Sequence, residues 1–176
     1  MALLAEEIVE EWLNRQGYFT IRGIKVGVHE IDLLAIRHSA AGLECRHLEV
    51  QASVRPVSYI TRVPLEVQKS TGRSATSSKT RSDEELRQGI REWIAKKFER
   101  PSKIQIRNQL APGPWSRELV VHKVYHAHEL ELIAKTGITV HQLMHVVAKL
   151  NAEGRVIQGA AGAHLTDLVA LAMHAK

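Results

Sequence analysis

Two strand-like segments joined by a short turn constrain this chain more than any other feature of its sequence. HEIDLLAIR (residues 29–37) carries few polar residues, and CRHLEVQAS (45–53) alternates apolar with polar ones. The segment between them, HSAAGLE, is typical of a hairpin connection. The two strands are therefore expected to pair antiparallel, which can bring Asp32 of the first strand beside Glu49 of the second.

The carboxylates of this hairpin are candidate metal ligands. Asp32 and Glu49 each belong to a strand whose other residues are largely apolar. A carboxylate on a buried strand costs free energy unless it is paired or binds a metal. Converging carboxylate oxygens are the ligands that Mg²⁺ prefers. The pattern therefore predicts a metal site at Asp32 and Glu49, and the alternative is that both lie at strand ends and are solvated.

The rest of the sequence predicts a single α/β domain. A length of 176 residues lies within the usual range of one domain. Apolar residues at helical spacing indicate a helix before the hairpin, and Gly17 ends it. The elements expected up to residue 107 are a helix over 3–13, a strand over 18–26, the two hairpin strands, a polar loop over 69–83, a helix to about Phe98 and a strand over 103–107.

A capping-box signature begins the helix that follows the polar loop. Ser82 is followed by Glu85 at the required spacing, and Pro101 closes the segment. One face of this helix is marked by Leu86, Ile90, Trp93, Ile94 and Lys97. The elements expected after it are a strand over 117–125, a helix to about Lys135, a strand from Ile138 to Val140, a helix to about Asn151 that stops at Gly154, and an amphipathic helix over 164–175. We expect one domain over 1–150 and a helical extension over 151–176 that packs on it.

Composition and charge narrow the setting and the partner. The segment MALLAEEIVEEW carries carboxylates where a signal peptide would be basic, and Cys45 is the only cysteine. No stretch approaches the roughly 18 uninterrupted apolar residues of a membrane-spanning helix. We therefore expect a cytoplasmic protein that does not bind a membrane. The net charge of +5, with basic residues clustered between Arg55 and Arg107, favours a polyanionic partner, although such a charge is also ordinary for a protein surface.

Three spaced motifs in the first 53 residues resemble the restriction-endonuclease-like (PD-(D/E)xK) nuclease superfamily, whose signature is Asp, a hairpin, then Glu-x-Lys. AEEIVEEWLNRQGY, HEIDLLAI and HLEVQAS look most like the resolvase-type and predicted-endonuclease branches. Those branches carry a glutamate in the first helix, eleven residues before the glycine that ends it. Glu6 and Gly17 match this spacing, and Leu13 matches the apolar residue between them. Glu30 and Asp32 match the family's Glu-apolar-Asp.

The resemblance implies a restriction-endonuclease-like core, with a central mixed sheet flanked by helices in αβββαβ order and a C-terminal helical extension. It also implies that Asp32 and Glu49 each give an oxygen to Mg²⁺ (or Mn²⁺) and that the carbonyl of Val50 adds a third ligand. Glu6 would hold a second ion or its water, or else belongs to a solvated helix face. Many relatives act as dimers, so a homodimer is possible.

Gln51 is the departure from the family pattern, because it stands where the lysine is expected. The lysine supplies a positive charge close to the attacking hydroxide and the scissile phosphate. Glutamine carries no charge, although its amide can orient a water. A lysine from elsewhere could replace the charge, and Lys69 and Lys79 in the polar loop are the candidates.

The function implied is a metal-dependent DNA endonuclease that hydrolyses phosphodiester bonds, with Asp32, Glu49, Gln51 and Glu6 in the catalytic site. DNA would be bound through the basic residues Lys69, Arg73, Lys79, Arg81 and Arg87. The alternative is a catalytically lapsed nuclease fold that binds DNA or acts as a scaffold. Retention of both carboxylates favours the enzyme, and loss of the lysine favours the alternative. A weaker interpretation takes residues 128–150 as the helix-turn-helix of a regulator.

Overall fold

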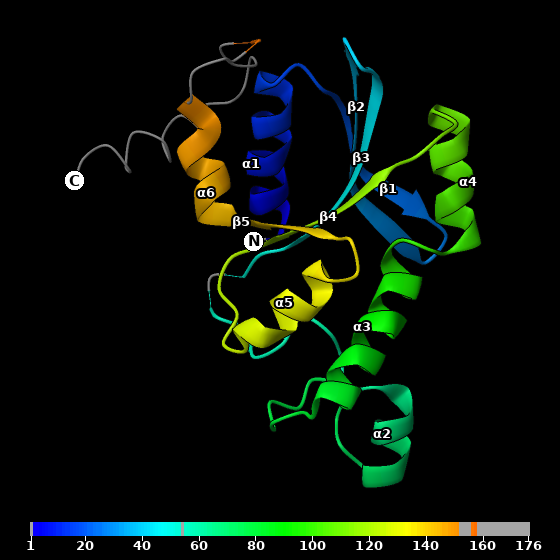
Figure 1. The fold of residues 1–176 in the computed structure, drawn as a ribbon, viewed down its shortest axis with the longest axis vertical. Helices are drawn as coiled ribbons and strands as arrows, with labels where there is room; N and C mark the ends of the chain where they lie inside the picture. The colour runs from blue at the N-terminus through cyan, green and yellow to red at the C-terminus, as the bar shows by residue number, and fades with distance from the viewer. Residues whose placement is uncertain (1, 54, 152–155, 158–176) are drawn as a thin grey trace, which may run out of the picture.

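Five β-strands form one mixed sheet at the centre of the fold, and helices cover both of its faces (Figure 1). The computed structural model describes residues 2–53, 55–151 and 156–157. The strands are β1 (Phe19–Val26), β2 (His29–Ser39), β3 (Gly42–Gln51), β4 (Ser116–Val121) and β5 (Thr139–Gln142). They lie in the order β1-β2-β3-β4-β5; β1, β2 and β3 form an antiparallel meander, and β4 and β5 continue it in parallel with β3.

The helices fall into two groups according to the face of the sheet they cover. Their bounds are α1 (Ala2–Arg15), α2 (Leu65–Thr71), α3 (Asp83–Lys97), α4 (Pro101–Leu110), α5 (Ala127–Ala134), α6 (Leu143–Ala148) and the short 3-10 helix η1 (Lys149–Asn151). α1 and α6 pack on one face, and α3 and α5 pack on the other. The sheet is thus a layer between two helical layers, as expected for an α/β protein.

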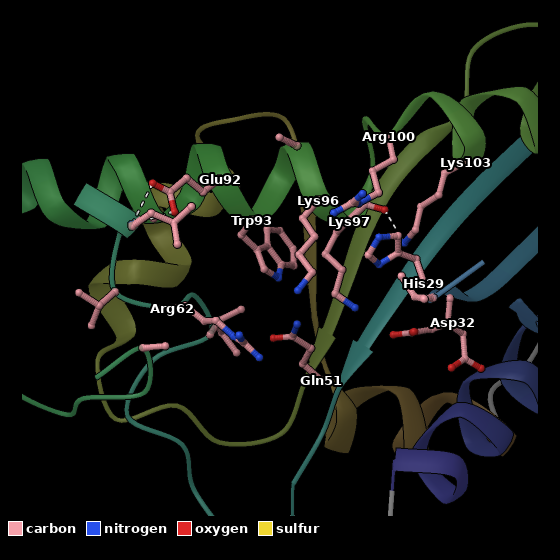
Figure 2. A pocket seen from close by; sticks show the side chains of 18 of the residues that line it. His29, Asp32, Gln51, Arg62, Glu92, Trp93, Lys96, Lys97, Arg100 and Lys103 are labelled. Carbon is pink, nitrogen blue, oxygen red and sulfur yellow. Dashed lines mark hydrogen bonds between the residues drawn. The ribbon is translucent and has the colours of Figure 1, made fainter. Parts of the chain in front are cut away.

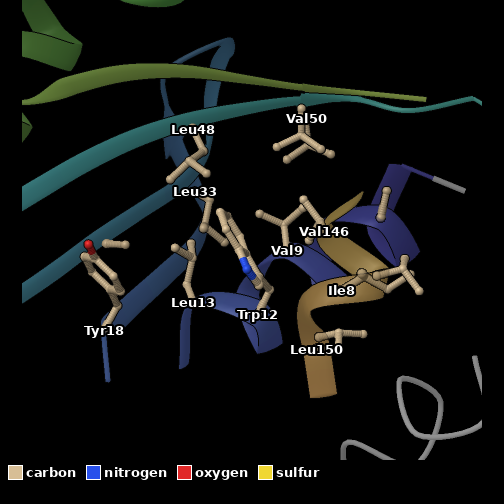
Figure 3. Packing of buried hydrophobic residues seen from close by; sticks show 14 residues of the cluster. Ile8, Val9, Trp12, Leu13, Tyr18, Leu33, Leu48, Val50, Val146 and Leu150 are labelled. Atoms are coloured by element: carbon tan, nitrogen blue, oxygen red, sulfur yellow. The ribbon is translucent and has the colours of Figure 1, made fainter. Parts of the chain in front are cut away.

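The core under α1 is apolar and combines aliphatic side chains with the rings of Trp12 and Tyr18 (Figure 3). Val9 and Leu13 are fully buried against Leu33 of β2 and Leu48 of β3. The apolar residues of α1 recur at helical spacing, so one side of the helix faces the sheet. Leu33 and Leu48 point toward α1, and the alternation of side chains then sends Asp32 and Glu49 to the opposite face, under α3 and α4.

The expected antiparallel hairpin is confirmed. Leu33 of β2 pairs with Leu48 of β3 in an antiparallel ladder. Asp32 and Glu49 each lie one residue beyond that pair, so the two carboxylates stand on neighbouring strands. The capping box at the start of α3 is confirmed as well, because the Ser82 side chain accepts from the Glu85 N–H at 3.2 Å and Glu85 accepts from the Ser82 N–H at 2.8 Å.

The expected strand over 103–107 is wrong, because these residues lie inside α4. Ile104 and Ile106 alternate with polar residues, which suggested a strand. Pro101 instead occupies the first turn of a helix, where its missing N–H costs nothing. The pattern of burial also differs from that expected of an apolar strand, because the Lys103 residue is 1% exposed whereas Ile104 is 37% exposed.

Two other expectations change in the second half of the chain. The polar loop over 69–83 begins with the last turn of α2, so its irregular part is shorter than expected. The helix-turn-helix over 128–150 is wrong, because β5 runs between α5 and α6 as an edge strand of the central sheet. The short strand expected from Ile138 to Val140 is present at nearly that position.

The expected stop at Gly154 and the amphipathic helix over 164–175 lie outside the described residues, as does most of the 151–176 extension. Within the described ranges, every helix is too short or too polar to cross a membrane.

Candidate active site

Asp32 of the hairpin lies at one end of a pocket between the sheet and α3 (Figure 2), whereas Glu49 is fully buried and does not line that pocket. The pocket has a volume of about 920 Å³ and is lined by side chains of β2, β3, the segment 60–68, α3 and the start of α4. We call it the site pocket; the residues that matter below are Asp32, Gln51, Arg62, Trp93, Lys96 and Lys97. Asp32 and Gln51 approach it from the sheet, and the lysines approach it from α3.

Glu49 is the most enclosed of the site carboxylates, with 0% of its surface exposed. Its Oε1 accepts from Lys103 Nζ at 3.0 Å and faces His47 Nε2 at 3.2 Å. Its Oε2 accepts from Lys97 Nζ. Burial alone would raise the pKa of Glu49, but the hydrogen bond from His47 and the charges of both lysines outweigh it and lower the pKa to about 2. Glu49 is therefore an anion compensated by the protein itself.

His47 is buried beneath Glu49 as a neutral imidazole. Burial, the largest influence, lowers the pKa of His47 below its ordinary value. Arg107 NH1 lies 2.6 Å from His47 Nδ1, and a guanidinium can only donate. Nδ1 is thus the acceptor and the proton is on Nε2, from which it is donated to Glu49. This tautomer adds a hydrogen bond to the carboxylate without adding a charge.

Asp32 is in a different electrostatic situation from Glu49. Its Oδ2 accepts from the Val50 N–H at 2.8 Å, which fixes the carboxyl against β3. Burial, followed by the repulsion of Glu49, raises the pKa of Asp32 to about 7. The site therefore holds two carboxylates with separated pKa values, one fully ionised and one that titrates near neutral pH.

A bend between α3 and α4 delivers both lysines. α3 ends at Lys97 and α4 begins at Pro101, so the two cations flank the connection. Phe98 in the bend is fully buried and packs edge-on against His47, with ring centroids 4.7 Å apart. Lys103 Nζ also donates to the Lys97 carbonyl at 2.9 Å, which ties the two helices together. Although burial acts to lower it, the pKa of Lys97 is raised by the charges of Glu49 and Asp32, so this lysine is charged.

The remaining residues expected in the site lie close by. Gln51 lines the site pocket with Asp32 and Glu30. Glu6 is 8% exposed and so does not belong to a solvated helix face. Burial, followed by the charge of Glu30, raises the pKa of Glu6, and Glu49 also contributes to this rise. Glu6, Asp32 and Glu49 thus lie near enough to interact electrostatically, and Gln51 lines the pocket with Asp32.

The expected metal ligands, Asp32, Glu49 and the Val50 carbonyl, lie on adjacent strands. Val50 donates its N–H to Asp32, and the N–H and carbonyl of one residue point to the same side of a strand, so the Val50 carbonyl also faces β2. The ammonium of Lys97 is a stand-in cation at Glu49, and its charge also interacts favourably with Asp32. A cation is therefore compatible with this position. Among the described residues no three His, Cys, Asp or Glu side chains form a metal-holding group, so a metal would need the backbone carbonyl or water to complete its shell.

The basic residues expected to bind DNA are placed differently from the expectation. Arg81 is 6% exposed, donates to the Thr61 carbonyl at 3.0 Å and lies over the Tyr59 ring, so it is a buried structural cation rather than a mobile one. Arg73 pairs with Glu85 at 2.8 Å. Lys69, Lys79 and Arg87 are exposed, and within the described ranges none of the five expected cations lines the site pocket. The cations that line it are Arg62, Lys96, Lys97, Arg100 and Lys103.

Lys97 and Lys103 are the site residues that the sequence reasoning missed. The replacement charge beside Gln51 was expected from Lys69 or Lys79, but the lysines that contact Glu49 are Lys97 and Lys103. A signal for Lys97 was present, since it continues the apolar face of α3 that includes Trp93 and Ile94. A lysine on a buried helix face needs an anion. Lys103 gave no such signal, because the alternation along its segment predicts a strand.

Comparisons with known proteins do not identify the chain. No protein-family model and no curated protein matches it. A crystal structure of a protein of unknown function, AF1548, resembles it with 12% sequence identity and a TM-score of 0.45, over 96% of this chain and 76% of that one. A function for the site therefore has to rest on its own geometry.

Proposed function

We propose that the chain is a metal-dependent DNA endonuclease of the restriction-endonuclease-like fold, in which Lys97 takes the part of the lysine that Gln51 replaces. The observation that carries the proposal is the ammonium of Lys97 at Glu49 Oε2, in the same pocket as Asp32 and Gln51. A charge at this position requires no lysine on β3. The departure at Gln51 is then a relocation of the charge rather than its loss.

The pair of carboxylates supports a divalent ion as cofactor. Asp32 and Glu49 would hold Mg²⁺ or Mn²⁺ together with the Val50 carbonyl, and Glu6 lies near enough to influence the charge of the site. When bound, the ion would supply Lewis acidity toward a phosphate oxygen. Lys97 donates to Glu49 Oε2 and also lines the site pocket, so its ammonium would leave that oxygen for the pocket if a metal were held there.

The protein's own groups can then assist hydrolysis in distinct ways. Water attacks phosphorus, the bond from phosphorus to the leaving oxygen breaks, and a proton reaches that oxygen. The Gln51 amide can orient the water, and Lys97 can stabilise the charge that develops on the phosphate oxygens. Lys103 and His47 keep Glu49 ionised throughout, because their hydrogen bonds to Oε1 do not depend on the pocket being occupied.

A charge-relocation experiment tests the proposal. Lys97→Met should lower Mg²⁺-dependent cleavage about tenfold to a thousandfold, the usual worth of one well-placed charge. Adding Gln51→Lys to that variant should restore much of the rate, because lysine then stands at the position used by the family. Lys96→Met is the matched control, because Lys96 also lines the pocket but is not one of the lysines that bond to Glu49 within the described residues. This variant should weaken substrate binding and leave the maximal rate unchanged. If Lys97→Met cuts as fast as the native protein, Lys97 has no part in the reaction.

A lapsed nuclease fold that only binds DNA is the second candidate, and one observation favours it. Both oxygens of Glu49 are already hydrogen-bonded to protein cations, so the carboxylate is compensated without a metal. In that case neither Mg²⁺ nor Mn²⁺ would support cleavage of any DNA form by the native protein. Calorimetric titration with Mn²⁺ separates the two candidate functions further. A lapsed nuclease should show no Mn²⁺ binding that is lost when Asp32 is replaced by Asn.

A further inference from the structure

The end of the site pocket away from Asp32 differs in chemistry from the end described above. It is walled by Ile60, Val63, Leu65 and the indole of Trp93, and Arg62 and Lys96 lie beside it. Ile60 and Val63 are buried, while Leu65 is exposed at the rim. Figure 2 shows Trp93 projecting from α3 into the pocket, on the side across from Gln51. An apolar wall therefore adjoins cations and an amide within one cavity.

Trp93 carries an unused hydrogen-bond donor in this wall. The residue is 7% exposed, and its Nε1 is buried with no hydrogen-bond partner among the described residues. A buried N–H without a partner costs about 1–3 kcal/mol, so such groups usually await a water or a ligand. The ring is held in place by its edge-on contact with Phe98, with centroids 5.6 Å apart. Its donor is thus fixed in direction.

The wall behind this donor is rigid because α3 approaches the segment 60–63 closely. A Cβ on Gly89 would lie 2.9 Å from the Arg62 carbonyl and 3.0 Å from Thr61 Oγ1. Thr61 is in turn bonded to the buried Glu129, through its N–H at 3.0 Å and its hydroxyl at 2.6 Å. The apolar end of the pocket is therefore formed before any ligand arrives.

We propose that this end of the site pocket receives one unpaired nucleobase of the DNA strand whose phosphate lies at Asp32 and Lys97, with the Trp93 N–H donating to a ring nitrogen or carbonyl of the base. The inference rests on the proposed function, since it names the form of DNA that the same site accepts. A flat heteroaromatic group with acceptors at its edge fits an apolar wall with one fixed donor. Arg62 and Lys96 also line the pocket and could supply cations to the flanking phosphates of that nucleotide.

The requirement for an unpaired base follows from the enclosure of the donor. In a duplex the flat faces of each base are stacked and its pairing edge is occupied, so a base reaches a walled pocket only when it is extruded or single-stranded. A volume of about 920 Å³ exceeds the lower end of the range for small-molecule pockets, about 300 Å³, so one nucleotide has room to enter. The substrate would then be DNA with an unpaired nucleotide next to the bond that is cut.

Binding measured without metal tests the inference apart from cleavage. Three otherwise identical duplexes are compared in EDTA: fully paired, with one bulged nucleotide, and with the same bulge lacking its base. The native protein should bind the bulged duplex about tenfold more tightly than the other two. Trp93→Phe should lower affinity for the bulged duplex about fivefold to tenfold, the worth of one hydrogen bond, and leave the other two affinities unchanged.

Two further variants keep the test decisive. Trp115→Phe is the matched control, because the Trp115 Nε1 already donates to the Ala111 carbonyl at 2.9 Å and the residue does not line the pocket; it should not change the preference. Leu65→Trp fills the exposed rim without disturbing the core and should also remove the preference for the bulge. Equal affinity of the native protein for all three duplexes, or an equal loss on all three with Trp93→Phe, would overturn the inference even if the protein cuts DNA. A Trp93-dependent preference in a protein that never cuts would uphold the pocket and refute the endonuclease.

Discussion

Lys97 donates a hydrogen bond to Glu49 although 48 residues separate the two in the sequence. Lys97 is the last residue of α3, and Glu49 lies inside β3, two residues before the uncharged Gln51. The positive charge beside the carboxylates therefore comes from a helix packed on the sheet rather than from the strand that carries Glu49. The charge balance of the site consequently depends on how α3 and α4 are seated.

Removing Lys103 should destabilise the protein strongly. Lys103→Met leaves Glu49 buried with one cation fewer, and breaking a buried pair in this way typically costs about 3–5 kcal/mol. Urea unfolding in the presence of EDTA measures the change. Lys135→Met, at the exposed end of α5, is the control and should alter the free energy of unfolding by less than about 0.5 kcal/mol.

The pairing itself is tested by adding Glu49→Gln to the Lys103 variant. Glu49→Gln alone leaves two lysines facing an uncharged amide and should also be destabilising, whereas the double variant should be more stable than the sum of the single losses predicts. Additive losses would mean that the two side chains do not interact in solution.

Asp32→Asn, unlike Lys103→Met, should raise the free energy of unfolding at neutral and alkaline pH. The folded-state pKa of Asp32 is raised from 3.8 to about 7, so the folded chain keeps a proton that the unfolded chain releases between those values. The protonated Asp32 carboxyl therefore contributes its full share to the free energy of unfolding below about pH 4, and this contribution is lost as the pH rises to about 7. Asn stays neutral, so the variant should exceed the native protein at pH 8 by on the order of 1–3 kcal/mol and match it near pH 4.

Unfolding curves recorded in EDTA from pH 4 to pH 8 check this difference. The titration of Glu49 does not interfere with this comparison. Its pKa is lowered to about 2, so its contribution to the free energy of unfolding is lost only as the pH falls from about 4.5 toward 2. The same Asp32→Asn protein should have lost metal-dependent cleavage, so stability and activity should move in opposite directions. Parallel pH profiles for the two proteins would show that the Asp32 carboxyl is solvated.

DNA binding should depend on salt through the cations of the pocket rather than through Arg81. Each of Arg62→Gln, Lys96→Gln and Arg100→Gln should reduce the slope of log affinity against log salt by about one, because each removes one phosphate contact. Arg81→Gln should lower the free energy of unfolding and leave that slope unchanged, since the guanidinium is bonded to Thr61 inside the protein. Fluorescence anisotropy over a range of salt concentrations measures the slopes. A steeper loss with Arg81→Gln than with Lys96→Gln would reverse the assignment.

Gly89→Ala should be destabilising although alanine is the better helix former. In an open helix the change would gain about 1 kcal/mol. Here the added Cβ would meet the Arg62 carbonyl at 2.9 Å, so α3 or the segment beside it has to shift, at a cost of about 1–3 kcal/mol. Thermal unfolding gives the sign of the net change. A gain in stability would mean that the wall of the pocket yields easily, contrary to the rigid arrangement described above.

The sequence predicted the hairpin and its carboxylates because both depend on local patterns. The mostly apolar β2, the period of two along β3 and the short turn between them are enough to predict an antiparallel hairpin that can bring Asp32 beside Glu49. The amphipathic period and the capping box likewise predicted α3. The central mixed sheet was implied by the family resemblance and not by these local patterns.

The partners of Glu49 could not be predicted in the same way, because they depend on a bend between two helices. Its direction is set by Phe98, which is buried against His47, and nothing local to the segment encodes that contact. The alternation of Ile104 and Ile106 outweighed the helix signal of Pro101, so Lys103 was placed on a strand. The burial of Arg81 could not be predicted, because its polar segment gives no sign that the side chain lies near the buried Glu129 and over the ring of Tyr59.

The bend that carries the two lysines also has a consequence for the order of folding. β1, β2 and β3 are joined by short turns and can pair from contacts close in sequence, while Glu49 is still in water. The cations belong to α3 and α4, later in the chain, so they would reach Glu49 only when these helices dock on the sheet. Docking therefore buries the carboxylate and neutralises it in a single event. In kinetic terms, this closure is expected to be a late step, and its rate is expected to depend on the ionic strength at which the protein folds.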